Sequence, residues 1–412
     1  MLDNQIAYKL FKATSISNVI VGKGDFLYET EYINSYYGND FVGLNELIAR
    51  YKKVKELQDY LSSIGIDLEI VFAPSKAAFY PEFIPDSWKY QKKLSNYDCA
   101  TALCQKLKIH HVDFNAWFKK IKDVTPYDLY PKTGIHWSNY GALIAADSLK
   151  KHIEFNTKLN LRGFVIKNIA YADSLLHPDD DMGIVMNLLK PIKTLPMPYA
   201  TYSWQEDETN TTKPRALIIA DSYFWQIYSQ GLANNFFTDP KFWYYNQSIY
   251  PETEAIREVS KLDIAEEIKK QQVIVIMATE INVHDIGWGF IEKALEVLKT
   301  KNGNSLRQRL YVNNIKEHIK NTPQWMNDIK KKAEDKKISV EEMISLDAIY
   351  IYETDYGKPE VIELIDQTKK RIENTPEWIS QIRIKAKEQG YTEQEMLELD
   401  AKYLYDTELK KK

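Results

Sequence analysis

A serine stands where a predicted buried strand ends and a helix begins, and this position favours nucleophilic chemistry. The apolar run from Ala216 to Ala220 predicts the strand, Asp221 and Ser222 follow it, and a helical pattern starts at Tyr223. Open α/β folds bind their ligands at the carboxyl ends of parallel strands. Unpaired N–H groups at the start of the helix would stabilise the oxyanion of an acyl-transfer intermediate. The Asp-Ser pair could equally cap the helix, and this pattern alone leaves both roles open.

A serine nucleophile needs a base, and His136 is our first choice among seven histidines. It lies in a loop beside Trp137, directly before Ser138, which is a predicted N-cap. Aromatic neighbours could hold its ring in place. The other histidines fall on predicted helix faces, beside short strands or in other loops: His110, His111, His152, His177, His284 and His318.

Other polar residues after predicted strands are weaker candidates for the same site. Asn246 and Asn282 could donate a hydrogen bond to an oxyanion, and Glu280 is a carboxylate at the end of a strand. Each could instead be an ordinary loop residue, a cap or half of an ion pair. The aspartates at 179–181 lack the Asp-x-Asp-x-Asp-Gly spacing of a calcium loop, so we expect a solvated turn there. No Cys/His spacing typical of a metal site occurs, and we expect neither a metal nor a cofactor.

Alternating strands and helices would position these residues. Strands are predicted at 19–21, 66–73, 109–112, 216–220, 242–245 and 273–277. Helices are predicted at 43–63, 95–107, 138–152, 223–232, 254–270 and 286–299. Continuous apolar strands between amphipathic helices indicate an α/β fold whose mostly parallel sheet has helices on both faces. Residues 160–212 show no clear period, and we expect loops and minor helices there.

The sequence after residue 300 predicts only helices, and it repeats. Residues 321–354 recur at 374–407 with an offset of 53 and no gaps, and 15 of the 34 positions are identical. Ser339 and Thr392 each begin the pattern of a capping box. We therefore expect a domain over 1–300, a linker at 300–304, and an all-helical region over 301–412 with two helical-hairpin repeats. Two copies are few for a free solenoid, so we expect the repeats to pack on themselves or to dock on the first domain or another protein.

Composition narrows the function classes. A chain of 412 residues exceeds what one core usually serves, which favours two domains. The net charge of −4, with acids and bases interspersed, lacks the basic footprint of a nucleic-acid-binding protein. There is no apolar run long enough to span a membrane, and no signal-peptide pattern follows Met1. The 28 Tyr and 9 Trp suit either a sugar-binding surface or an aromatic core.

Several segments together resemble the SGNH-hydrolase-like family of alginate O-acetyltransferases and its relatives in other polysaccharide systems. The segments are Val21-Gly22-Lys23-Gly24-Asp25-Phe26-Leu27-Tyr28, Phe72-Ala73-Pro74-Ser75-Lys76, Tyr80-Pro81, His136-Trp137-Ser138-Asn139-Tyr140-Gly141, Ala220-Asp221-Ser222-Tyr223 and Thr279-Glu280. The resemblance covers residues 18–300 and implies an SGNH-hydrolase-like (flavodoxin-like) domain. The all-α C-terminal region lies outside it.

The resemblance also implies a mechanism. Ser222 would attack an acyl donor with His136 as its base, and the acyl-enzyme would pass an acyl group, most simply acetyl, to a hydroxyl of an exported or cell-surface bacterial polysaccharide. Transfer to water instead would make the protein an acetylesterase. Members of the family are typically exported, so we expect a periplasmic or otherwise exported location. They work beside a membrane-bound acyl-transfer partner, and we expect such a partner here.

One position departs from the family pattern. The family's triad aspartate lies two residues before the histidine, where this sequence has Gly134. An orienting acid fixes the histidine tautomer and stabilises the imidazolium. Three outcomes stay open: another carboxylate replaces it, with Asp128 nearest in sequence; a backbone carbonyl holds the ring and leaves a Ser–His dyad; or the protein binds polysaccharide, or scaffolds an acetylation complex, without catalysis.

Overall fold

A six-stranded sheet forms the centre of the N-terminal part of the chain. The computed structural model describes residues 1–14, 16–205, 210–336 and 338–410, except for the side chains of 299–306 and 309. The sheet strands are β3 (Asp67–Ala73), β4 (His111–Asp113), β7 (Arg215–Ala220), β8 (Thr238–Tyr244), β9 (Ser248–Tyr250) and β10 (Val273–Thr279). Their spatial order is β4-β3-β10-β7-β8-β9, and only β8 and β9 pair antiparallel. The predicted mostly parallel sheet is confirmed.

The strand order departs from the flavodoxin-like one in a single respect. Numbered along the chain, the five parallel strands lie in the order 2-1-5-3-4, because β10 stands between β3 and β7. The flavodoxin-like order is 2-1-3-4-5, with the last strand at the edge. All seven residues of β10 are buried, and such a continuously apolar strand suits the centre of a sheet covered on both faces.

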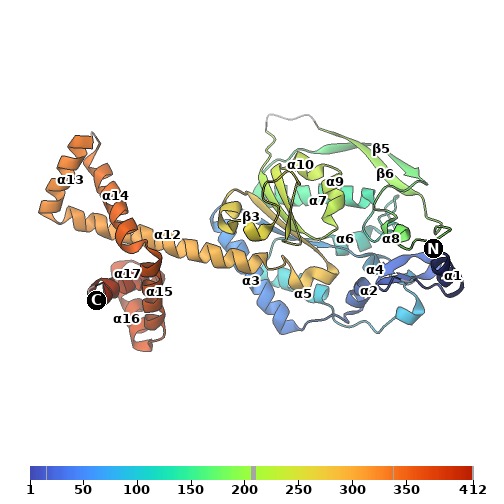
Figure 1. Ribbon diagram of the computed structural model, residues 1–412, viewed down its shortest axis with the longest axis horizontal. Coiled ribbons are helices and arrows are strands. Elements are labelled where there is room, and N and C mark those ends of the chain that lie inside the picture. Colours follow the sequence, from blue (N-terminus) through green and yellow to red (C-terminus); the bar gives the residue numbers. More distant parts are fainter. Residues whose placement is uncertain (15, 206–209, 337, 411–412) are drawn as a thin grey trace. The chain divides into compact units, whose positions relative to one another are not determined.

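Helices cover both faces of the sheet (Figure 1). The helices of this part of the chain with at least six residues are α1 (Leu2–Phe11), α2 (Thr30–Tyr37), α3 (Leu44–Ser63), α5 (Asn96–Leu107), α6 (Phe114–Ile121), α7 (Asn139–Thr157), α9 (Phe224–Ser229) and α11 (Ile264–Lys269). Val71, Ile218 and Val275 share one hydrophobic cluster with Leu149 of α7. Alternate positions along each strand point to the opposite face, so the neighbouring residues of β3, β7 and β10 face the other helical layer.

Two segments differ from the sequence-based expectation. Residues 160–212 contain an antiparallel pair of strands, β5 (Phe164–Ala172) and β6 (Met197–Trp204), and the short helix α8 (Asp181–Val185) between them; 206–209 lie outside the described residues. The strands were missed because β5 is mostly exposed and so carries no apolar alternation. The helix expected over 254–270 is shorter in the structure, where it is α11. Its N-cap is Asp263, whose side chain accepts hydrogen bonds from the N–H groups of Ala265 and Glu266.

The C-terminal part of the chain is helical throughout its described residues, as predicted. Its helices are α12 (Phe290–Lys320), α13 (Pro323–Lys336), α14 (Val340–Ile351), α15 (Pro359–Glu373), α16 (Pro376–Gln389) and α17 (Glu393–Leu404). The chain divides into two units, Met1–Glu296 and Val297–Lys412. The linker expected at 300–304 is wrong, because α12 runs through it. One internal glycine, Gly303, costs a helix only about 1 kcal/mol.

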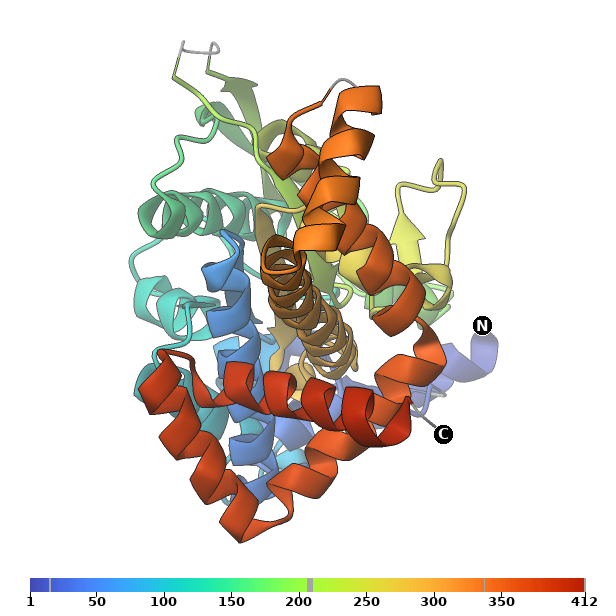
Figure 2. The same ribbon diagram turned by 90° about the vertical axis from the view of Figure 1, so that its left-hand side faces the viewer.

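The two sequence repeats have the same local structure. Each is a helical hairpin, α13–α14 in orange and α16–α17 in red (Figure 2). Ser339 and Thr392 both complete a capping box. The same ion pair recurs at the offset of 53, since Lys332 Nζ lies 2.8 Å from Asp347 and Lys385 Nζ lies 2.7 Å from Asp400. Among the described residues, no helix has both the length and the apolar character needed to cross a membrane.

Candidate active site

Ser222, His136 and Asp181 form a continuous chain of hydrogen-bonding contacts in the N-terminal unit. The Oγ atom of Ser222 lies 3.0 Å from Nε2 of His136. On the other side of the ring, Nδ1 of His136 lies 2.9 Å from Oδ2 of Asp181. The side chains of His136 and Asp181 are 16% and 19% exposed, so the site is reachable from solvent. This order of groups is the one that acyl transfer requires of a nucleophile, a base and an acid that orients the base.

The neighbouring Asp221 fixes Ser222 at the end of β7. Its Oδ2 accepts hydrogen bonds from N–H and Oγ1–H of Thr279, at 2.7 and 2.8 Å, and from Nδ2 of Asn282 at 3.0 Å. Its Oδ1 accepts one from the N–H of Tyr223 at 3.1 Å. Asp221 and Asn282, both candidates from the sequence, therefore join the ends of β7 and β10. Neither touches the reacting atoms.

The loop that carries His136 is bound to the segment after Ser222. The hydroxyl of Tyr223 donates to the carbonyl oxygen of Ile135 at 2.9 Å, and Nε1 of Trp137 donates to that of Tyr223 at 3.1 Å. The side chain of Gln226 donates to the Trp137 carbonyl oxygen. Trp137 and Tyr223 are fully buried. Because both partners of the Ser222–His136 contact lie on segments that hold each other, their separation is set by buried packing.

The orienting acid is Asp181, the first residue of α8. Its Oδ1 accepts hydrogen bonds from the N–H groups of Ile135, at 2.9 Å, and Met182, at 2.7 Å, which leaves Oδ2 directed at His136. The expected solvated turn at 179–181 is therefore wrong. Asp179 is buried as well, its Oδ2 accepts from the Tyr199 hydroxyl at 2.7 Å, and burial raises the pKa of Asp179 to about 6.

Asp128, the nearest acid in sequence, does not replace the missing family aspartate. Its carboxylate accepts from the Tyr171 hydroxyl at 3.2 Å and makes no contact with His136 among the described interactions. Gly134 itself leaves no room for an acid. A Cβ atom there would lie 2.8 Å from the carbonyl oxygens of Pro178 and Asp179, closer than such atoms approach.

A buried lysine supports the turn before His136. The ammonium group of Lys76 donates to three backbone carbonyl oxygens, those of Pro131 at 3.4 Å, Lys132 at 3.2 Å and Gly134. Burial lowers the pKa of Lys76 to about 7, and the charges of Asp181 and Glu29 partly oppose this. Sequence reasoning missed this role, because nothing in the sequence separates a buried lysine from an exposed one.

Tyr245 is a second residue that sequence reasoning missed. Its hydroxyl lies near the side chain and the backbone of Ser222, while burial raises the pKa of Tyr245 above its ordinary value. Tyr245 and Asn246 occupy a tight turn with φ of 50° and 54°, in which the N–H of Gln247 donates to the carbonyl oxygen of Tyr244. Consecutive left-handed residues other than glycine are uncommon and cluster at functional sites.

A second strained segment packs against Tyr245. Gly287, Trp288 and Gly289 all have positive φ, and the rings of Tyr245 and Trp288 meet edge to face at 5.1 Å. Nδ2 of Asn246 donates to the Trp288 carbonyl oxygen at 3.0 Å, so Asn246 braces this segment, and no described contact joins it to Ser222. Two strained turns thus hold an aromatic pair beside the serine.

The remaining expectations concern donors and acids around Ser222. The N–H groups of Tyr223, Phe224 and Trp225 are engaged by Asp221 and Ser222, so the helix start does not offer them to an oxyanion. Glu280 lies after β10 as predicted but is buried, and its Oε2 accepts from the Ser75 hydroxyl at 2.6 Å. Burial raises the pKa of Glu280 to about 7. Among the contacts described, Glu280 makes none with Ser222 or His136.

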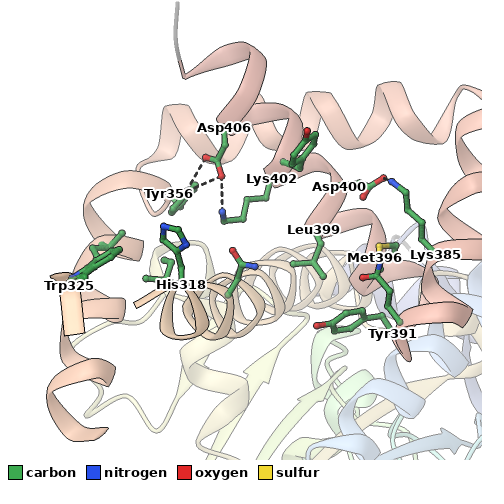
Figure 3. Close-up of a pocket in the computed structure, with 15 residues that line it drawn as sticks. His318, Trp325, Tyr356, Lys385, Tyr391, Met396, Leu399, Asp400, Lys402 and Asp406 are labelled. Atoms are coloured by element: carbon green, nitrogen blue, oxygen red, sulfur yellow. Dashed lines mark hydrogen bonds and ion pairs between the residues drawn. The ribbon is translucent and has the colours of Figure 1, made fainter. Parts of the chain in front are cut away.

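The C-terminal unit has a cavity of about 820 Å³ (Figure 3). Lys385 and Asp400 pair there, as do Lys402 and Asp406, so its main charges are neutralised by one another. No serine, threonine or cysteine is among the described residues that line it. The hydroxyl groups in its lining belong to tyrosines, and the candidate catalytic residues described above lie in the N-terminal unit.

Comparison with known proteins also points to the N-terminal unit. Residues 19–216 match the family model described as the SGNH hydrolase-like domain of the acetyltransferase AlgX. A relative named "Probable alginate O-acetylase AlgJ", from Pseudomonas fluorescens, is 28% identical over 153 residues, which are 37% of this chain and 37% of the relative. The matched segment thus spans little more than a third of that relative. His136 and Asp181 lie within the family match, and Ser222 lies beyond its end.

Two solved structures are similar to part of the chain. The O-acetyltransferase domain of Pseudomonas putida AlgJ has a TM-score of 0.44 and 16% identity, over 65% of this chain and 92% of that one. Pseudomonas aeruginosa AlgX has a TM-score of 0.45 and 13% identity, over 65% and 67%. The family match over residues 19–216 and the mostly parallel sheet show that the N-terminal unit carries an SGNH hydrolase-like domain similar to that of the acetyltransferase AlgX.

Proposed function

We propose that this protein transfers an acetyl group to hydroxyls of an exported bacterial polysaccharide through an acyl-enzyme on Ser222. The observation that carries the proposal is the chain of contacts from Ser222 through His136 to Asp181, at 3.0 and 2.9 Å. These separations fall within the range for direct proton transfer. The nucleophile also follows the carboxyl end of a parallel strand, where folds of this class bind ligands.

In the first half-reaction, Nε2 of His136 takes the proton of the Ser222 hydroxyl while Oγ attacks the carbonyl carbon of the acyl donor. Asp181 stabilises the imidazolium that forms. The tetrahedral oxyanion would lie beside the Ser222 N–H and the Tyr245 hydroxyl, which is near Ser222. Collapse of the intermediate expels the donor's leaving group, protonated by His136, and leaves an ester on Ser222.

In the second half-reaction a sugar hydroxyl takes the place of the leaving group. His136 removes its proton, the sugar oxygen attacks the ester carbonyl, and the proton returns to Ser222 as the acetylated sugar leaves. Attack by water in place of sugar would release acetate. The similarity to a probable alginate O-acetylase and to the acetyltransferase AlgX supports a polysaccharide acceptor. We include in the proposal an exported location and a membrane-bound protein that supplies the acyl group.

The competing function is a polysaccharide-binding or scaffold protein of an acetylation complex without catalysis. That alternative depended on Gly134 in place of the family aspartate. Because Oδ2 of Asp181 lies beside Nδ1 of His136, another carboxylate is placed to orient the ring, and Gly134 is compatible with activity.

The test has a chemical arm and an acceptor arm. The full-length protein is given 4-nitrophenyl acetate, and intact mass spectrometry with peptide mapping locates the acetylated residue. An alginate oligosaccharide is then added, and its acetylation is followed by mass. We expect acetyl on Ser222, loss of turnover in Ser222→Ala and His136→Ala, and wild-type turnover in the exposed-serine control Ser63→Ala. Turnover that survives Ser222→Ala would overturn the proposal.

A further inference from the structure

Three potential metal ligands, Asp67, Glu69 and His110, meet at the opposite end of the sheet from Ser222, and His152 lies beside Glu69. Asp67 and Glu69 are two apart on β3 and so point to the same face. His110 directly precedes β4, and His152 lies on α7. One ligand atom each from Asp67, Glu69 and His110 lie within 4.8 Å of one another. Three separate segments of the chain thus direct carboxylate and imidazole groups toward one place.

These groups are only partly satisfied by one another, since the hydrogen bond between His110 and Asp67 uses one carboxylate oxygen alone. The Oδ2 atom of Asp67, the Oε2 atom of Glu69 and Nε2 of His152 are buried, and none makes a hydrogen bond among the described residues. The Glu69 side chain is fully buried. One carboxylate oxygen of Glu69 lies within 4.8 Å of one of Asp67. Two ionised carboxylates this close in a buried site repel each other, and a bound cation would relieve that repulsion.

The separations match the edges of a metal coordination sphere. Nδ1 of His110 lies 3.0 Å from Oδ1 of Asp67, and Nε2 of His152 lies 3.2 Å from Oε2 of Glu69. Ligands about 2.1 Å from a zinc ion at a tetrahedral angle are themselves about 3.4 Å apart. The second pair has this separation without hydrogen-bond geometry, as expected for two atoms that both face a third centre.

We propose that Asp67, Glu69, His110 and His152 bind one divalent transition-metal ion, with Zn²⁺ preferred. Two imidazoles and two carboxylates are donors that zinc accepts in tetrahedral sites, whereas Ca²⁺ and Mg²⁺ prefer oxygen alone. Asn156, one turn along α7 from His152, donates to Oε1 of Glu69 and leaves Oε2 free for the ion. Such an outer hydrogen bond orients a ligating carboxylate.

The ion would act on the fold and not on acyl transfer. Asp67 pairs in register with Val273 of β10, which in turn pairs with Ala216 of β7. Ser222 is six residues beyond Ala216, and strands rise about 3.3 Å per residue, so the two sites are roughly 20 Å apart. Bound metal would join β3, α7 and the segment before β4, and we expect it to raise the melting temperature.

The experiment uses full-length protein stripped of metal with a chelator that is then removed. Zinc chloride is titrated by calorimetry, the melting temperature is measured with and without zinc, and cobalt chloride is added to record visible absorption. We expect one equivalent to bind, the melting temperature to rise, and cobalt to give the intense d–d bands of tetrahedral coordination.

Two variants locate the site. His110→Ala and His152→Ala should each weaken zinc binding by at least about tenfold. The matched control His111→Ala changes an adjacent histidine whose Nδ1 contacts the Ile109 carbonyl oxygen, and it should bind like wild type. Hydrolysis of 4-nitrophenyl acetate should be unchanged in all three, which verifies folding. Absence of saturable zinc binding to wild-type protein overturns the proposal and needs no variant. Wild-type affinity in both His110→Ala and His152→Ala overturns it as well.

Discussion

Replacing Asp181 with asparagine isolates the contribution of the orienting carboxylate. In the wild-type protein one oxygen accepts from the N–H groups of Ile135 and Met182, and the other faces Nδ1 of His136. Asparagine can keep its carbonyl oxygen on the two backbone donors. Its NH₂ group then faces Nδ1, so the ring must carry its proton on Nε2. In that tautomer Nε2 cannot accept the proton of Ser222.

The expected loss follows from this change of tautomer. Where a serine protease depends on its aspartate, the same substitution lowers kcat by about 10⁴. At about 1.36 kcal/mol per tenfold, this corresponds to roughly 5 kcal/mol of transition-state stabilisation. Because the backbone contacts of residue 181 are retained, the melting temperature should change little. A large kinetic effect without a large stability effect is the signature of a group that acts through the histidine.

The assay is single-turnover acetylation of Ser222 by 4-nitrophenyl acetate in a stopped-flow instrument. Asp128→Asn is the matched control, since that carboxylate contacts Tyr171 and not His136. It should acetylate at the wild-type rate. If Asp181→Asn stays within about threefold of wild type while Ser222→Ala is inactive, the acid is dispensable and our reasoning about its role is refuted.

Three further substitutions test other parts of the site. Tyr245→Phe removes a hydroxyl beside Ser222 and should lower kcat about 10²–10³-fold with little change in KM; an unchanged kcat would exclude it as an oxyanion donor. Glu280→Gln should be as stable as wild type below pH 4.5 and up to about 3 kcal/mol more stable above pH 7, because the raised pKa makes ionisation of the buried acid unfavourable in the folded state. If this reasoning is wrong, urea unfolding will give the same difference in unfolding free energy between the variant and the wild type at both pH values. Gly134→Ala should cost about 1–3 kcal/mol and reduce activity, since its Cβ meets backbone oxygens at 2.8 Å; wild-type stability in thermal unfolding would contradict this.

The sequence predicts those strands of the sheet that are apolar because they are buried on both faces. Strand β10, β7 after its first residue and the second half of β3 are continuous apolar runs, because helices cover both of their faces. β5 is mostly exposed, and its pairing with β6 depends on backbone hydrogen bonds that leave no apolar pattern. The position of β10 between β3 and β7 was also out of reach, because strand order depends on packing between segments far apart in sequence.

The same distinction applies to the site. Ser222 could be placed because it follows a recognisable strand, and His136 because it lies in a recognisable motif. Asp181 is 45 residues from His136 and reaches it only through the fold. Lys76 and Tyr245 act through burial and a strained turn, respectively, and neither property has a spacing rule. The four proposed metal ligands come from three separate segments, so spacing rules for metal sites could not reveal them either.

Gly134 and Asp181 depend on each other in this structure. The carbonyl oxygens of Pro178 and Asp179 approach Gly134 so closely that no side chain fits, and this approach brings Asp181 to Nδ1 of His136. An aspartate at 134 would displace the segment that now supplies the acid. Conversely, without the 178–181 segment in place, glycine at 134 would leave the ring without an acid. A substitution that looks inactivating along the sequence is therefore compatible with a complete Ser–His–Asp chain, provided that the acid arrives from another segment through the space that the missing side chain vacates.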